Sequence, residues 1–360
     1  MPQQITLFEC GEDGQLQIPS GGGAYRIGRK LLNHTYNEII SLENLCLAWE
    51  EFIVGKKRKQ DIQQFAYRLM DNIVELHESL VNHMYAHGGY ESFIIHDPKR
   101  RHIHKASVRD RLLHHAVYRK LYPFFDRTFI ADSFSCRDGK GTHKALDRFQ
   151  RFAFQAGKNH TRTVLVLKCD IRKFFGSIDQ SVLMGLLCES IQDQNILRLL
   201  ENIIKSYHTE FQPGVGLPLG NLTSQLFANV YLDRFDQWVK HRLKVKYYIR
   251  YADDFVFLSD ARTWLTSVLP CITSFLQEEL HLLLHPDKVF LKTVASGVDY
   301  LGWVHFSEYC VLRASTRRRM LKRLRFCPTE ATLQSYFGLL SHGNTERLRK
   351  DVVVSYWLWQ

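Results

Sequence analysis

The stretch that decides the fold is KYYIRYADDFVFLS, residues 246–259. Two apolar and aromatic segments flank Ala252-Asp253-Asp254, a pattern that predicts a hairpin with two carboxylates at its tip. A second apolar run, TVLVLKC at 163–169, ends at Asp170 and is typical of a buried central strand. If these strands are neighbours, three carboxylates converge at one edge of a sheet.

Two readings of the aspartates follow from the pattern. Asp is a common turn residue, so the pair Asp253-Asp254 on its own fits an ordinary turn. Three converging carboxylates repel one another strongly unless they bind divalent cations. Two metal ions about 4 Å apart, which clamp the attacking and leaving oxygens, are the known arrangement for nucleotidyl transfer. A turn and a two-metal site are therefore the alternatives.

The sequence around the aspartates resembles that of reverse transcriptases. Tyr251-Ala-Asp-Asp254 resembles their YxDD box, and KCDIRKFFGSID at 168–179 resembles their first catalytic box, DIxxFFxxID. Three further segments match later boxes in the family's order: GLPLGNLTSQLFAN at 216–229 for LPQGxxxSP, LLLHPDK at 282–288 for (N/H)PxK, and YLGW at 300–303 for the primer-grip YLG. Five boxes in the right order and spacing make a chance match implausible.

Upstream segments narrow the resemblance. DPKRRHI at 97–103, VRDR at 108–111 and SFSCRDGKGTH at 133–143 resemble fingers boxes of group II intron-like bacterial enzymes. Leu219 stands where the family usually has Gln, and Ser224-Gln225 stands where it usually has Ser-Pro. With these departures the chain resembles the reverse transcriptases of diversity-generating retroelements, from about Ser41 to the C-terminus.

The resemblance implies an α+β fold, a right-hand polymerase with helical fingers, an antiparallel-sheet palm and a small helical thumb. The expected divisions are an N-terminal extension at 1–33, fingers at 34–160, a palm with interleaved helices at 161–306 and a thumb at 307–360.

Two local patterns add expectations of their own. The apolar residues of 62–84 recur at spacings of three and four, which predicts one long amphipathic helix. Apolar runs at 289–291 and 300–306 predict a hairpin.

By the same resemblance, Asp170, Asp253 and Asp254 are the catalytic residues and hold two Mg²⁺ ions, with the Ile171 carbonyl as a further ligand. Carboxylate clusters suit Mg²⁺, which is a hard cation. The positions that match contacts to the incoming nucleotide are Lys99, Arg101, Phe175, Leu219 and Lys288. Those that match contacts to template or primer are Arg137, Lys140, Ser224, Gln225, Gly302, Arg317, Arg318 and Lys322.

Several of these residues have a purely structural alternative. Phe175 is expected to be the aromatic gate against a ribose 2′-hydroxyl, or else a core aromatic beside Phe174. The basic residues around Lys99 and at 313–325 either contact phosphates or are simply solvated. Leu219 cannot hydrogen-bond a nucleotide as glutamine would, which predicts relaxed fidelity unless Leu219 only packs the pocket. The resemblance implies that the relaxed fidelity takes the form of misincorporation opposite template adenines.

Composition agrees with a nucleic-acid enzyme. The chain has 360 residues, with 48 Lys and Arg against 37 Asp and Glu, so its formal net charge of +11 predicts an anionic partner. It has no apolar run of about 18 residues, so no membrane span is expected. The N-terminus lacks a signal-peptide pattern, and the eight cysteines are scattered without zinc-ligand spacing. We therefore expect a cytoplasmic protein, and the resemblance implies that it is bacterial or phage-encoded.

The function implied by the resemblance is RNA-directed DNA synthesis. The enzyme would copy a template repeat RNA into mutagenised cDNA with primer and dNTPs, beside a small basic accessory protein that forms a pentameric ring. One alternative is a related bacterial reverse transcriptase in phage defence or a group II intron-like element. Another is a non-catalytic RNA-binding protein that keeps the polymerase fold.

Overall fold

The computed structural model describes residues 30–96, 100–209 and 212–358. The chain divides into two compact units, each assembled from three segments. The first comprises Met1–Ile130, Ile171–Trp238 and Leu269–Leu283, and the second Ala131–Asp170, Val239–Val268 and Leu284–Gln360. The expected boundaries of fingers, palm and thumb stay a prediction. Of the expected extension at 1–33, residues 1–29 lie outside the described residues.

The first unit is mainly helical, and its helices begin where the sequence supplies N-caps. Thr35 and Glu38 form a reciprocal capping box at the first helix, and the side chains of Asp179 and Asp193 cap two later helices. Its elements are α1 (Tyr36–Ile40), α2 (Leu42–Phe52), α3 (Gln60–Tyr67), α4 (Leu69–Val81), β1 (Tyr90–Ile95), β2 (Arg101–Ala106), α5 (Val108–Asp126), α7 (Phe174–Ser177), α8 (Gln180–Cys188), α9 (Gln194–Lys205), and most of α10 (Leu222–His241) and α11 (Arg262–Leu280).

A four-stranded antiparallel sheet forms the centre of the second unit. Its strands are β3 (Leu165–Asp170), β4 (Tyr248–Tyr251), β5 (Asp254–Ser259) and β6 (Phe290–Thr293), in the order β4-β5-β3-β6. Every residue of β3 except Asp170 is buried. A strand with a partner on each edge and cover on both faces favours such an apolar run.

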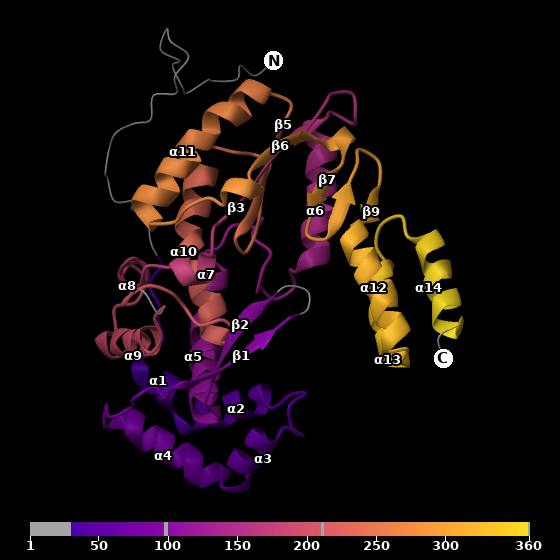
Figure 1. Cartoon of the computed structure of the whole chain (residues 1–360). Helices are drawn as coiled ribbons and strands as arrows, with labels where there is room; N and C mark the ends of the chain where they lie inside the picture. Colours follow the sequence, from indigo (N-terminus) through magenta and orange to yellow (C-terminus); the bar gives the residue numbers. More distant parts are fainter. Residues whose placement is uncertain (1–29, 97–99, 210–211, 359–360) are drawn as a thin grey trace. The chain divides into compact units, whose positions relative to one another are not determined.

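The rest of the second unit contains a small sheet and several helices (Figure 1). These elements contribute buried side chains to one hydrophobic core. Phe149, Trp303 and Met320 are buried in this core and come from a helix, a strand and a C-terminal helix respectively. The elements are α6 (Thr142–Ala156), η1 (Pro286–Lys288), η2 (Val294–Ser296), β7 (Val298–Tyr300), β8 (Trp303–His305), β9 (Cys310–Leu312), α12 (Ala314–Phe326), α13 (Glu330–Leu340) and α14 (Glu346–Leu358).

The expected α+β class with antiparallel sheets is confirmed, and the hairpin at the aspartates is present as β4–β5. The other predicted hairpin, 289–291 with 300–306, is wrong. Strand β6 pairs with β3, and the chain then turns through η2 and Gly297, at φ +87°, into the separate β7–β8 pair. Short apolar runs identify strands but do not specify their partners.

The predicted helix over 62–84 is also divided. Arg68, at φ −122° and ψ 47°, separates α3 from α4, and α4 already ends at Val81. Among the described residues, no helix is long and apolar enough to cross a membrane.

Candidate active site

A tight turn between β4 and β5 carries the paired aspartates. Tyr251 and Asp254 are the closing pair of the ladder, and Ala252 at the tip has φ +53°. Arg250 lies beneath the turn with its side chain fully buried, and its Nη1 donates to the Ala252 carbonyl at 3.2 Å. A left-handed alanine costs about 1 kcal/mol, so this buried guanidinium helps to stabilise the turn.

Asp170 lies directly opposite Asp254 in the β3–β5 ladder. Side chains of such antiparallel partners have Cβ atoms about 4.5–5.5 Å apart, so the two carboxylates are neighbours on one face. Asp253 precedes Asp254 at the tip of the hairpin. The register therefore brings the three predicted catalytic residues to one edge of the sheet.

Two lysines pair with these carboxylates. Lys288 Nζ on η1 lies 2.7 Å from Asp170 Oδ1, and Lys168 Nζ on β3 lies 3.2 Å from Asp254 Oδ2. The side chain of Lys288 is 42% exposed, whereas that of Lys168 is 11% exposed. Lys288 had been predicted as a nucleotide contact, and no sequence motif pointed to Lys168.

The environment of Asp254 disfavours the ionised form of its carboxylate. Burial raises its pKa to about 6, Lys168 opposes this shift, and the charges of Asp170 and Asp253 add to it. Its Oδ1 atom is buried and has no hydrogen-bond partner among the described residues. An unpartnered buried carboxylate oxygen is a site at which a cation would be stabilised.

The donors fit a hard divalent cation, although they do not form a ready-made cage. Within the described part of the chain, no group of three His, Cys, Asp or Glu side chains is arranged to hold a metal ion as it stands. The lysines neutralise two of the carboxylates instead. Asp170, Asp253 and Asp254 would be the ligands. Ile171 is buried and has no polar side-chain atom, so it would bind a cation only through its backbone carbonyl oxygen.

The predicted template and primer contacts in this unit are partly engaged in local structure. Arg137 Nη1 donates to the Ser133 carbonyl at 3.1 Å, and Lys140 Nζ donates to the Ala131 carbonyl at 2.8 Å. Gly302, at φ +90°, follows β7 in the turn to β8. The predicted cations on α12, Arg317, Arg318 and Lys322, are exposed, opposite the buried Met320 and Leu324.

The remaining predicted residues belong to the other unit. Arg101 is exposed at the start of β2, and Phe175 is half-buried on α7 beside the buried Phe174. Leu219 is half-buried, and its carbonyl accepts from His104 N at 2.9 Å. On α10, Ser224 is buried and Gln225 is half-buried, so exposure favours Gln225 over Ser224 as a contact to a template or primer strand. Lys99 lies outside the described residues.

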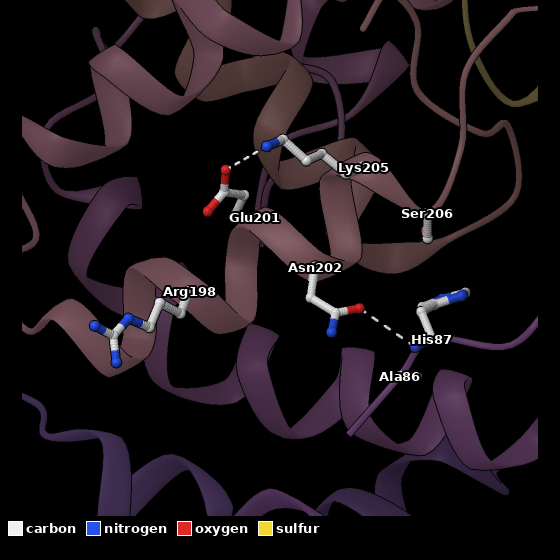
Figure 2. A pocket seen from close by; sticks show the side chains of 7 residues that line it. All are labelled: Ala86, His87, Arg198, Glu201, Asn202, Lys205 and Ser206. Carbon is white, nitrogen blue, oxygen red and sulfur yellow. Dashed lines mark hydrogen bonds and ion pairs between the residues drawn. The ribbon is translucent and has the colours of Figure 1, made fainter. Parts of the chain in front are cut away.

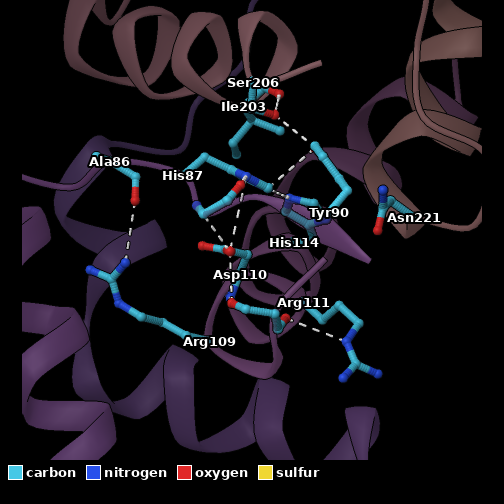
Figure 3. A network of polar contacts seen from close by, with 12 residues as sticks. Ala86, His87, Tyr90, Arg109, Asp110, Arg111, His114, Ile203, Ser206 and Asn221 are labelled. Atoms are coloured by element: carbon cyan, nitrogen blue, oxygen red, sulfur yellow. Dashed lines mark hydrogen bonds and ion pairs between the residues drawn. The ribbon is translucent and has the colours of Figure 1, made fainter. Parts of the chain in front are cut away.

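A buried polar network in the first unit was not foreseen (Figure 3). Asp110 accepts hydrogen bonds from Tyr85 Oη at 2.8 Å, Ser107 Oγ at 2.7 Å and Gly88 N at 3.1 Å. His114 is buried, and its Nε2 lies 3.2 Å from His87 Nε2. The pair Asp110-Arg111 contributed only to the resemblance. Asp110 is the residue around which this network is arranged because its neighbours are buried, and the sequence does not show that burial.

A shallow, open surface pocket lies next to this network (Figure 2). Lys205 and Glu201 form an ion pair at its side, and Asn202 Oδ1 accepts from His87 N at 3.3 Å. Its lining residues are Ala86, His87, Arg198, Glu201, Asn202, Lys205 and Ser206. None of the three aspartates belongs to it, so the carboxylate cluster remains the candidate active site.

Comparison with known proteins adds an independent finding. The model of the family described as "Reverse transcriptase (RNA-dependent DNA polymerase)" matches residues 95–305, which include every residue of the carboxylate cluster. The chain is similar to Protein YkfC of Escherichia coli (strain K12), with 24% identity over 232 residues that cover 54% of this chain and 60% of YkfC.

Two further similarities are more partial. Group II intron-encoded protein LtrA of Lactococcus lactis subsp. cremoris is 28% identical over 145 residues, 38% of this chain and 22% of LtrA. A solved telomerase from Candida albicans, in complex with a fragment of telomeric RNA, aligns with a TM-score of 0.49 and 12% identity over 74% of this chain and 55% of its own. The chain thus spans 60% of the length of YkfC and 22% of the length of LtrA.

Proposed function

The chain belongs to the reverse transcriptase family, whose model matches more than half of it, and on this basis we propose that it is an RNA-directed DNA polymerase. The observation that carries the proposal is the β3–β5 register, which sets Asp170 opposite Asp254 with Asp253 beside them. Its substrates would be an RNA template, a primer and dNTPs, and we propose that the reaction takes place in the cytoplasm of bacterial or phage-infected cells.

The residues of the cluster have separate tasks in this proposal. Asp170, Asp253 and Asp254 would hold two Mg²⁺ ions, with the Ile171 carbonyl as a further ligand. When bound there, the ions would supply Lewis-acid stabilisation of the attacking 3′-oxygen and of the leaving pyrophosphate. Lys288, half exposed beside Asp170, is able to turn toward an incoming triphosphate.

The experiment that tests this function is primer extension on a defined RNA template with Mg²⁺. The D253N/D254N variant should lose at least about 10³-fold of the activity, because each substitution removes a carboxylate that would hold the ions. D260N is the matched control, since Asp260 lies just beyond the far end of β5 in an exposed ion pair with Arg162. Absence of DNA synthesis by the unmodified chain, also with the cognate RNA and an accessory protein, would favour a non-catalytic RNA-binding protein.

The finer proposal is that the cDNA diversifies a gene within a diversity-generating retroelement. Its support is the segment LGNLTSQLFAN with Leu219 in place of Gln, together with the resemblance that also implies template repeat RNA and a small basic accessory protein forming a pentameric ring. Half-burial leaves part of the Leu219 side chain accessible.

Fidelity separates this proposal from its alternative. We expect misincorporation opposite template adenines by the unmodified chain, and about a tenfold lower error rate in L219Q, because an amide can hydrogen-bond the nucleotide. Sequencing of the extension products measures both. Accurate synthesis by the unmodified chain would favour a group II intron-like or phage-defence enzyme, an alternative that the similarity to LtrA supports.

A further inference from the structure

Lys168 is a buried cation beside the carboxylate cluster. It lies on β3 two residues before Asp170, so both side chains point to the same face of the sheet. Its Nζ is 3.2 Å from Asp254 Oδ2 and donates to the backbone carbonyl of Asp299, on β7, at 3.2 Å. Nζ also lies 5.8 Å and 5.9 Å from the ring centroids of Tyr300 and Phe290.

Burial makes this arrangement persistent. A buried ammonium is costly unless paired, and here one carboxylate, one carbonyl and two aromatic faces surround it. Movement of Lys168 away from Asp254 would leave both charges buried and uncompensated. Lys288 differs, because its half-exposed ammonium leaves Asp170 for water at little cost.

We propose that Lys168 is a positioning residue for the polymerase reaction: it holds Asp254 by Oδ2 against β7 and leaves Oδ1 for a divalent cation. The inference rests on the proposed function for the role of Asp254. Lys168 thereby holds the Asp254 carboxylate through Oδ2, whereas Oδ1 is the oxygen that has no hydrogen-bond partner among the described residues. Lys288, in contrast, is the displaceable partner of Asp170.

Lys168→Met removes the charge and keeps an unbranched side chain of similar length. The variant should bind Mn²⁺ about threefold to tenfold more tightly, because a positive charge next to the site is gone and Asp254 offers both oxygens. Its turnover at saturating Mn²⁺ should fall about tenfold or more, because the carboxylate is no longer held in place. A side chain that only packed would not move these two quantities in opposite directions.

Lys292→Met is the matched control. Lys292 is exposed on β6, the other neighbour of β3, and its Nζ lies over the ring of Phe290 at 5.2 Å. Both the Mn²⁺ dissociation constant and the turnover should stay at the values of the unmodified chain.

The measurement is Mn²⁺ binding to the full chain by electron paramagnetic resonance, without nucleic acid or nucleotide, followed by primer extension at saturating Mn²⁺. Unchanged or weaker Mn²⁺ binding by Lys168→Met overturns the proposal, and so does unchanged turnover. If the unmodified chain makes no DNA, the proposed function fails, and the Mn²⁺ titration alone then decides the role of Lys168.

A second variant covers failure of Lys168→Met to fold. The double variant Lys168→Met/Asp254→Asn removes both charges, so it should regain a higher thermal midpoint than Lys168→Met alone. A double variant that unfolds as readily as the single one would show that Lys168 supports the sheet without acting through Asp254, and would overturn the proposal.

Discussion

The buried imidazole of His114 makes the first unit sensitive to acid. Burial, together with the neighbouring His87, lowers the pKa of His114 from 6.5 to about 3. The imidazole of His114 is therefore neutral in the folded chain at pH values at which it is protonated in the unfolded chain. The stability that follows is complete above the unfolded pKa and is lost as the pH falls from about 6.5 toward 3.

His114→Gln should remove this part of the pH dependence. The free energy of unfolding of the unmodified chain should fall by up to about 1.4 kcal/mol per pH unit more than that of the variant below pH 6. Urea unfolding between pH 4 and pH 8 measures the difference, with His102→Gln, at an exposed position, as control. Parallel pH profiles of His114→Gln and the unmodified chain would contradict the assignment.

At this scale the sequence predicted the residues whose spacing is local. Asp253 and Asp254 follow from the hairpin pattern, and Asp170 from the strand that ends at it. Lys168 and Arg250 could not be predicted, because their importance depends on which strand lies beside which and on burial that only the assembled sheet creates.

At the scale of elements, the turn between α13 and α14 packs tightly against the small sheet. Gly343 has φ +67°, and a Cβ there would lie 2.5 Å from Trp303 Cζ3 and 2.9 Å from Cys310 Sγ. Asn344 N donates to the Cys310 carbonyl at 2.9 Å. The glycine thus permits the helical pair to meet β8 and β9.

Gly343→Ala should lower the free energy of unfolding by about 2–4 kcal/mol, from overpacking together with the left-handed backbone. Gly338→Ala, within α13, is the control: a Cβ there meets nothing within 4 Å, so this variant should be neutral or slightly stabilising. Thermal unfolding of both variants is the measurement, and equal midpoints would refute the packing argument.

Elements were predictable where the signal lies within them. The run of apolar residues specified β3. The partner of β6 was not predictable, because pairing with β3 joins residues far apart in the chain and depends on the turn at Gly297. Strand β2 was not predicted, because its residues are mostly polar and all but one of them are at least partly exposed to solvent.

At the scale of the whole molecule, the net charge of +11 should make binding to nucleic acid strongly dependent on salt. If α12 contacts phosphates, R317A/R318A/K322A should reduce the slope of log K against log salt by about 2 to 3. Fluorescence anisotropy with labelled RNA–DNA duplex across a salt series measures the slope. K57A/R58A/K59A, which removes three exposed cations from the loop between α2 and α3, is the control of equal charge. Equal slopes for both variants would remove α12 from the interface.

The strand order β4-β5-β3-β6 also has a consequence for synthesis of the protein. Strand β3 leaves the ribosome first, yet its ladder partners β5 and β6 begin only at Asp254 and Phe290. At about 5–20 residues per second, an apolar strand waits on the order of ten seconds with both edges unpaired. Chaperones have that interval in which to act. During it Asp170 lacks its opposite carboxylate, so a nascent chain has no assembled carboxylate cluster while its own messenger RNA is close by.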